Sequence, residues 1–209
     1  PLLRRILLLT LLLTLLVGPV TVRAADDGSI GGVVISGSAN STPVAGLEVR
    51  LTVFDDMKAA ADYKTTTDDA GNYEFTGLET DLAFSYRLET DFAEMPYVSG
   101  FLQFPPDETL IPWDFTVYET TADPGVVSLV MAHVIMAAGE GYLSVTEYHV
   151  VANGSSLAYV GAMVEGEEWR EVLSFAVPEG ASALEFAEGL TDIRMWPEGS
   201  GFSDGATLR

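Results

Sequence analysis

Apolar and polar residues alternate with a period of two along much of this chain, and no stretch shows a convincing helical periodicity. The alternation is clearest in residues 82–89 (LAFSYRLE). A second stretch, residues 65–78 (TTTDDAGNYEFTGL), places a cluster of turn-forming residues between two such runs. Because successive side chains of a strand point to opposite faces, this pattern predicts an all-β fold, with residues 65–78 as a β-hairpin in a half-buried sheet.

Seven short strands are expected before residue 120. They cover residues 30–35, 47–53, 64–67, 73–78, 82–89, 97–104 and 113–117. Residues 55–62 are interpreted as a loop or a single helical turn. Short strands separated by turn signals predict an Ig-like β-sandwich for residues 25–120.

The order of four segments, GGVVISG, PVAGLEVRLTVFD, TTTDDAGNYEFTGL and FSYRLET, resembles the carboxypeptidase regulatory-like domain. This is a transthyretin-like sandwich, grouped with carbohydrate-binding-like and Cna-B-type modules, and the resemblance covers about residues 28–120. The family domain is usually a non-catalytic accessory of exported proteins, which the resemblance implies here. Residues 30–35 lack the lysine used for self-formed isopeptide cross-links, so we expect no cross-link. Neither His133 nor His149 has a glutamate three residues away, as the zinc peptidase of that name requires.

The N-terminal residues have the organisation of a secretory leader. Arginines at positions 4 and 5 precede the apolar run 6–17, and Val22 and Ala24 satisfy the small-residue rule for cleavage. We therefore predict a signal peptide at 1–24, and a secreted, cell-surface or periplasmic protein. The alternative is a membrane anchor, but this run is shorter than the ~20 residues needed to span a bilayer. Membrane attachment is expected only through an anchor outside the given chain.

Charge and cysteine content exclude several classes of function. All 31 acidic residues but only seven of the 10 basic ones follow Ala24, so the chain after the predicted cut carries a net charge of −24. Such a surface cannot neutralise phosphates, and we expect no nucleic-acid partner. The absence of cysteine excludes disulfides, thiolate metal sites, covalent haem attachment and an N-terminal lipidated cysteine.

A second β-rich domain is expected at residues 126–209, after a linker at 121–125 that contains Pro124 and Gly125. Segments 126–138 and 142–152 flank a glycine-containing turn and predict a hairpin. Further strands are expected at 157–164, 172–177 and 184–187. The last residues, 199–209, have a loop composition and predict no closing strand. A sandwich truncated at its C-terminus is therefore an alternative to a complete one.

Two groups of residues are candidate metal ligands. Asp68, Asp69 and Asn72, with Glu74 nearby, offer oxygen atoms of the kind that calcium binds. A plain turn is the other interpretation, because the alternating spacing of a dedicated calcium loop is missing.

The second group depends on the register of the predicted hairpin. If its turn is centred on Glu140, His133 lies opposite Glu147 and shares a face with His149, an arrangement suited to zinc. A slip of one residue would separate these side chains. The alternative interpretation is that they are ordinary polar residues facing solvent.

Aromatic residues allow a third kind of site. Trp113, Tyr97, Phe101 and Phe104 could form a platform on which a sugar ring stacks, although such rings in a cysteine-free sandwich are more often core. The alternation instead directs Trp113 inward. No nucleophile elbow or phosphate-binding glycine loop occurs.

The sequence therefore predicts an exported, non-enzymatic structural or binding module of a bacterial cell surface or envelope, without a cofactor unless calcium or zinc binds. Its partner would be a protein or a carbohydrate at the cell surface. A carbohydrate-binding module is one alternative, and an accessory or metal-binding domain of a metal-dependent hydrolase is another.

Overall fold

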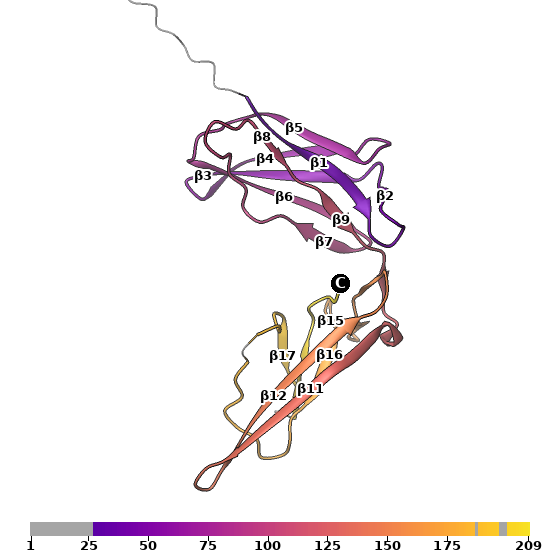
Figure 1. Ribbon diagram of the computed structural model, residues 1–209, viewed down its shortest axis with the longest axis vertical. Coiled ribbons are helices and arrows are strands. Elements are labelled where there is room, and N and C mark those ends of the chain that lie inside the picture. The colour runs from indigo at the N-terminus through magenta and orange to yellow at the C-terminus, as the bar shows by residue number, and fades with distance from the viewer. Residues whose placement is uncertain (1–26, 187, 197–199) are drawn as a thin grey trace, which may run out of the picture.

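The computed structural model describes residues 27–186, 188–196 and 200–209, and it confirms that the protein is all-β. In these ranges the one helical element is a short 3₁₀ turn, η1 (Pro124–Val126), and none is long and apolar enough to cross a membrane. The predicted signal peptide, residues 1–24, lies outside the described residues. Figure 1 shows two groups of strands, β1–β9 and β11–β18, with the long β11–β12 hairpin projecting away from the first group.

The first sheet is organised around β1, which pairs along both of its edges. Its strands are β1 (Gly28–Ser36), β2 (Thr42–Pro43), β5 (Asn72–Leu78), β8 (Leu110–Pro112) and β9 (Phe115–Val117). β5 and β2 pair antiparallel to β1, whereas β8 and β9 pair parallel to it. The segment between β8 and β9 therefore passes close to the middle of β1.

The second sheet is fully antiparallel, in the order β4-β3-β6-β7. Its strands are β3 (Glu48–Asp55), β4 (Lys58–Thr66), β6 (Phe84–Phe92) and β7 (Met95–Val98). The outer face of this sheet carries an ion-pair network, in which Arg50 contacts Asp91 at 2.7 Å and Glu89 at 2.8 Å. The alternation predicted for β3 and β6 is therefore correct: one face is charged and the other is apolar.

Side chains from both sheets form one hydrophobic core. Ile30 and Val34 of β1 are fully buried, together with Leu51 of β3 and Leu88 of β6. The ring of Tyr86 is also buried, and its hydroxyl donates to the backbone oxygen of Glu79. Burial, followed by the charge of Glu79, raises the pKa of Tyr86 to about 12.

The predicted hairpin at residues 65–78 is wrong in its pairing, although both of its strands exist. β4 pairs with β3 and β5 pairs with β1, so the turn connects the two sheets. Within it, the N–H of Asp68 donates to Asn72 O, and the N–H of Gly71 donates to Asp68 O, both at 2.9 Å. The chain thus reverses direction through a closed turn, and the apolar side chains of each strand reach the core from opposite sheets.

Two other local predictions are also wrong. Most of segment 55–62, expected as a loop or helical turn, belongs to β4, because Asp56 and Met57 both adopt positive φ and make a two-residue turn from β3. Residues 97–104 were expected as one strand. β7 ends at Val98, and only Leu102 continues the pairing as an isolated bridge to Tyr86.

The second group contains one long hairpin and several shorter strands. The shorter strands are β13 (Ala158–Tyr159), β14 (Ala162–Met163), β15 (Arg170–Glu171), β16 (Leu173–Ala176), β17 (Ile193–Met195) and β18 (Gly201–Asp204). The expected absence of a closing strand is wrong, since β18 is the central strand of the sheet β16-β18-β17. The strand expected at 184–187 is not formed by residues 184–186, which belong to no strand, and Ala187 lies outside the described residues.

The two groups meet at a short parallel pairing. β10 (Thr120–Thr121) pairs with β13, and the buried Ala158 and Val160 belong to the same hydrophobic cluster as the first group. The predicted linker 121–125 therefore begins in β10 and ends in η1. The side chain of Asp123 caps η1 by accepting from the N–H of Gly125 at 2.9 Å.

Candidate functional site

The longest pair of strands among the described residues is the hairpin formed by β11 (Val127–Ala138) and β12 (Leu143–Asn153). Its turn is closed by the N–H of Gly139, which donates to Tyr142 O at 2.9 Å, and Gly141 supplies the positive φ. The sequence predicted this hairpin and its ends to within a residue or two. A bulge between Leu129 and Met131 interrupts the ladder near its base.

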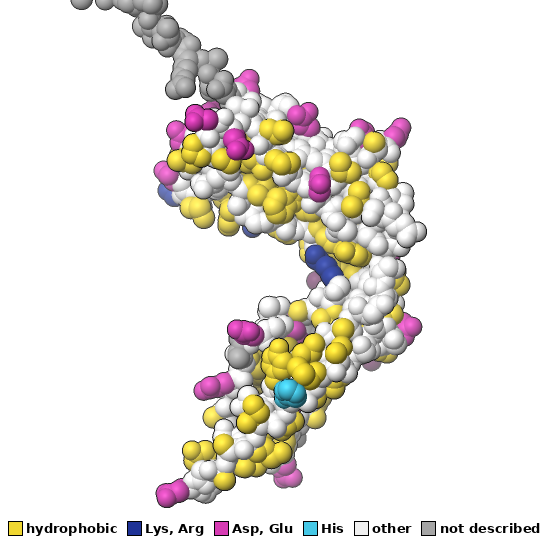
Figure 2. All heavy atoms as spheres, viewed as in Figure 1, with side chains coloured by type: hydrophobic (Ala, Val, Ile, Leu, Met, Phe, Trp, Pro, Cys, Tyr) yellow, Lys and Arg dark blue, Asp and Glu magenta, His cyan; other side chains and the backbone are white. Residues whose placement is uncertain are grey.

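Exposed apolar side chains lie on both faces of the hairpin, among polar ones. Val134 pairs with Glu147 and Met136 with Val145, which places three apolar side chains and one carboxylate on one face. On the other face Ile135 pairs with Thr146. Nine of the hairpin's large apolar side chains are between 48% and 68% exposed: Leu129, Val130, Val134, Ile135, Met136, Tyr142, Leu143, Val145 and Tyr148. Hydrophobic side chains accordingly gather over this part of the molecule in Figure 2.

Only the base of the hairpin is supported by the rest of the second group. The ring of His149 in β12 lies 5.7 Å from that of Phe175 in β16, which in turn stacks on Phe202 of β18 at 4.9 Å. Phe186 packs edge-on against Phe202 at 4.7 Å. β12 is therefore half-buried toward its end, whereas β11 is exposed along almost its whole length. Neither strand pairs with a third strand among the described residues.

The register expected for the histidine site is wrong by one residue. His133 lies opposite Tyr148, and Ala132 lies opposite His149, so the two imidazoles are on opposite faces of the hairpin. Glu147 does approach His149, with its Oε2 at 3.0 Å from Nε2. Within the described ranges, no group of three or more histidine, aspartate or glutamate side chains is arranged to hold a metal ion.

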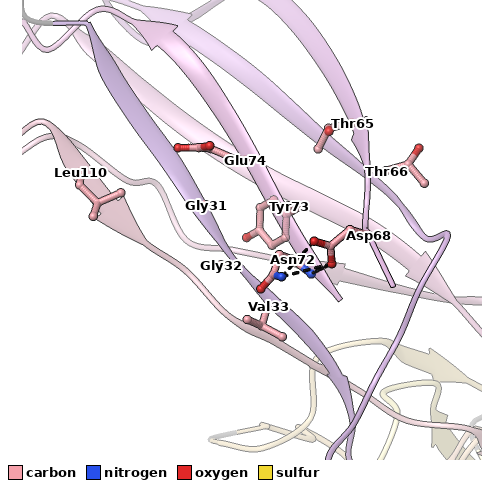
Figure 3. Close-up of a pocket in the computed structure, with 10 residues that line it drawn as sticks. All are labelled: Gly31, Gly32, Val33, Thr65, Thr66, Asp68, Asn72, Tyr73, Glu74 and Leu110. Carbon is pink, nitrogen blue, oxygen red and sulfur yellow. Dashed lines mark hydrogen bonds between the residues drawn. The ribbon is translucent and has the colours of Figure 1, made fainter. Parts of the chain in front are cut away.

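The acidic turn expected as a calcium candidate is closed by its own hydrogen bonds. Asp68 Oδ1 accepts from the N–H groups of Ala70 and Asn72, at 2.9 and 2.8 Å, and Oδ2 accepts from the Asn72 amide at 3.0 Å. These donors, led by the Asn72 side chain, hold the pKa of Asp68 below its usual value. Figure 3 shows Asn72 directing its nitrogen, and not its oxygen, at the carboxylate. Asp69 is exposed beside this turn.

A groove of about 540 Å³ lies next to this turn, over the middle of β1 and the start of β5. Its lining is mostly polar or backbone: Gly31, Gly32, Val33, Thr65, Thr66, Asp68, Asn72, Tyr73, Glu74 and Leu110 (Figure 3). The ring of Tyr73 is buried, so the groove offers hydrogen-bonding groups and two carboxylates without an exposed aromatic surface.

The floor of the groove depends on a glycine. A Cβ on Gly32 would lie 1.8 Å from Trp113 O, since the β8–β9 connection runs along the edge of β1 and places this oxygen against Gly32. That oxygen accepts from the hydroxyl of Tyr73 at 2.6 Å, and the N–H of Trp113 donates to Gly31 O at 2.8 Å. Burial, followed by the charge of Asp114, raises the pKa of Tyr73. These hydrogen bonds hold the β8–β9 connection against the edge of β1.

The aromatic residues considered for sugar stacking are dispersed. Tyr97 and Phe104 are buried in the core, and Trp113 is half-buried against it, as the alternation predicted. Phe101 alone of these four is exposed, and its ring packs edge-on against Phe54 at 5.2 Å. The four rings do not form one platform.

The exposure of the β11–β12 hairpin was not anticipated from the sequence. Residues 126–138 (VVSLVMAHVIMAA) carry no formal charge and no strict alternation, which indicates a strand covered on both faces. The sequence therefore contained a signal that this strand needs partners. It could not show that the described chain leaves most of the strand uncovered.

Comparisons with known proteins assign no family to this chain, and its all-β class comes from the structure itself. No protein-family model matches the sequence, and no curated protein does so either. One similar solved structure is the crystal structure of a 9R-lipoxygenase from Cyanothece PCC8801, at 16% identity and a TM-score of 0.26. The similarity covers 47% of this chain and 17% of the lipoxygenase chain. At this level it defines neither the fold nor the function of this protein.

Proposed function

We propose that this protein is an exported, non-enzymatic structural or binding module of a bacterial cell surface or envelope. The observation that carries the proposal is the β11–β12 hairpin, whose exposed apolar side chains extend over both faces. Contiguous apolar surfaces of this kind mark interaction sites, because their exposure to water is unfavourable. The contact surface of the module is therefore the hairpin.

The first group of strands fits a supporting role in this proposal. Its two sheets share one core, and the turn at Asp68 joins them, which is compatible with a transthyretin-like β-sandwich of the carboxypeptidase regulatory-like kind. Three polar side chains of the groove are engaged in hydrogen bonds: Asp68 and Asn72 in the turn, and Tyr73 with the β8–β9 connection. In the proposed protein this unit is a rigid spacer, and the second group carries the contact surface.

The proposal is tested on protein exported from a bacterial host, with the N-terminal cut mapped by mass spectrometry. We expect no turnover of peptide, ester or glycoside substrates and no stoichiometric metal. Hydrolysis accompanied by bound zinc, with both lost when His133 and His149 are replaced, would establish the metal-dependent alternative. Specific sugar binding on a glycan array that disappears in Phe101→Ala would establish the carbohydrate-binding alternative.

A further inference from the structure

Resting on the proposed function, we propose that the partner of the hairpin is a second copy of this chain, which pairs antiparallel with it along the free edge of β11. The result is a four-stranded sheet across a two-fold axis. A strand edge with unpaired N–H and C=O groups is a template for another strand.

The free edges select a strand as the occupant. An isolated two-stranded hairpin is marginal in water, and β11 and β12 pair only with each other among the described residues. A lipid surface would cover the apolar side chains but would leave the edge groups without hydrogen-bond partners in hydrocarbon, which is very unfavourable. A paired strand satisfies the edge and covers side chains at the same time.

The two faces favour pairing at the edge over stacking on one face. Val134 and Met136 point to one face and Ile135 to the other, and all three are exposed. Edge pairing brings the side chains of neighbouring strands together on both faces. Edge pairing therefore gives all three side chains new neighbours, whereas stacking through a single face contacts only the residues of that face.

The absence of charged side chains on β11 makes this strand a better edge for self-pairing than β12. The chain after Ala24 carries a net charge of −24, so two copies repel each other over most of their surface. β11 contains no aspartate, glutamate, lysine or arginine, whereas β12 contains Glu147. Pairing of β12 with its copy would bring two Glu147 carboxylates close together. β12 also packs at its base against β16 through His149, which leaves β11 as the more open edge.

The exposed area of β11 suits a weak, reversible dimer. Five of the nine exposed apolar side chains belong to β11. If a large apolar side chain offers on the order of 150 Å² when fully exposed, these five, which are about half to two-thirds exposed, leave roughly 450 Å² on each copy. Two copies then bury less than a standard interface of about 800 Å² on each partner, which is the range of weak and transient association.

Sedimentation velocity of the exported protein, over a concentration series, tests the proposal with two matched variants. Ile135 and Leu82 are each 64% exposed, but only Ile135 lies in β11. We expect a monomer–dimer equilibrium whose dissociation constant rises roughly tenfold or more in Ile135→Lys and stays unchanged in Leu82→Lys. Thermal melts of both variants show whether the fold is intact.

Single cysteines then locate the paired edge, because the chain has none of its own. Val134→Cys, Ile135→Cys and Met136→Cys, together with single-cysteine variants at the other positions of β11, scan the whole strand, because only residues at or next to the two-fold axis face their own copies. Disulfide-linked dimers should form at one or two of these positions and not in Leu82→Cys. Cross-linking through Val145→Cys of β12 instead would overturn the assignment of the edge.

A protein that stays monomeric at every concentration, or a dimer unaffected by Ile135→Lys, would overturn the proposal of a second copy. A monomer that binds lipid vesicles or an extended peptide through the hairpin would also overturn it. If the hairpin binds vesicles or a peptide, the proposed function as a binding module would still stand. Turnover of a substrate would instead remove the proposed function, whatever the state of association.

Discussion

Replacement of Gly32 by alanine should destabilise the first group of strands strongly, because a backbone oxygen occupies the position of the new Cβ. The distance from that Cβ to Trp113 O would have to grow from 1.8 Å to the 3.4 Å at which ordinary van der Waals contact begins. Neither partner is the end of a flexible side chain. The β8–β9 connection must therefore move away from β1.

The size of the effect follows from the hydrogen bonds that this movement weakens. They are Trp113 N–H to Gly31 O at 2.8 Å, Tyr73 hydroxyl to Trp113 O at 2.6 Å, and Val33 N–H to Asp114 Oδ1 at 2.8 Å. Each contributes about 1 kcal/mol net, and overpacking adds about 1–3 kcal/mol. The free energy of unfolding should fall by roughly 4–6 kcal/mol if all three bonds are lost, out of ~5–15 kcal/mol for a typical domain.

The assay is thermal unfolding followed by circular dichroism, with Gly100→Ala as the matched control. A Cβ on Gly100 meets nothing within 4 Å. At about 2–4 °C per kcal/mol for a chain of this size, Gly32→Ala should melt roughly 10 °C below the wild type, and Gly100→Ala should melt close to it. Equal melting temperatures for the two variants would contradict this prediction, since the β8–β9 connection would then have room to relax.

Three further predictions concern the same framework. Asp68 has a lowered pKa in the folded protein, so its ionised carboxylate stabilises the fold at any pH above the ordinary aspartate pKa near 4. This stability is lost as the pH falls through the lower folded pKa. The difference in unfolding free energy between wild type and Asp68→Ala, measured by urea titration, should therefore be constant near neutral pH and disappear below about pH 4. Trp113→Ala should lower the melting temperature, because the ring packs half-buried against the core and loses a large part of the ~3–5 kcal/mol that a fully buried tryptophan contributes; an unchanged melt would place the ring outside the core. Limited proteolysis should nick within 121–125 and leave a stable fragment 25–120, and a fragment unfolded by circular dichroism would show that the first group needs the contacts of Ala158 and Val160 to fold.

The strands with strict alternation could be predicted from the sequence, because burial of one face requires that pattern. β1, β3 and β6 lie close to their expected positions. Which strands pair with each other was harder to predict from the sequence. The turn at Asp68 has the same residues whether its two strands pair with each other or belong to different sheets. The turn at Asp56 and Met57 has no glycine to signal positive φ, and β18 is stabilised by neighbours distant in the chain, such as Phe175.

The candidate site could be predicted only in part. The ends of the β11–β12 hairpin follow from its turn residues, but the histidine arrangement depends on the register, and a shift of one residue separates His133 from His149. Exposure is a property of the whole molecule, because it depends on which other elements cover a strand. No local pattern in residues 126–138 shows that its apolar side chains remain uncovered.

Amide hydrogen exchange of the hairpin, measured on dilute and concentrated protein, tests most directly whether this surface is a contact surface for a second copy. In an antiparallel pair about half of the N–H groups of an edge strand point away from its partner. The account predicts that these amides of β11 exchange freely in dilute protein and become protected at high concentration, with little change in β1 or β3. Rapid exchange along β11 at every concentration, while the core strands stay protected, would contradict it.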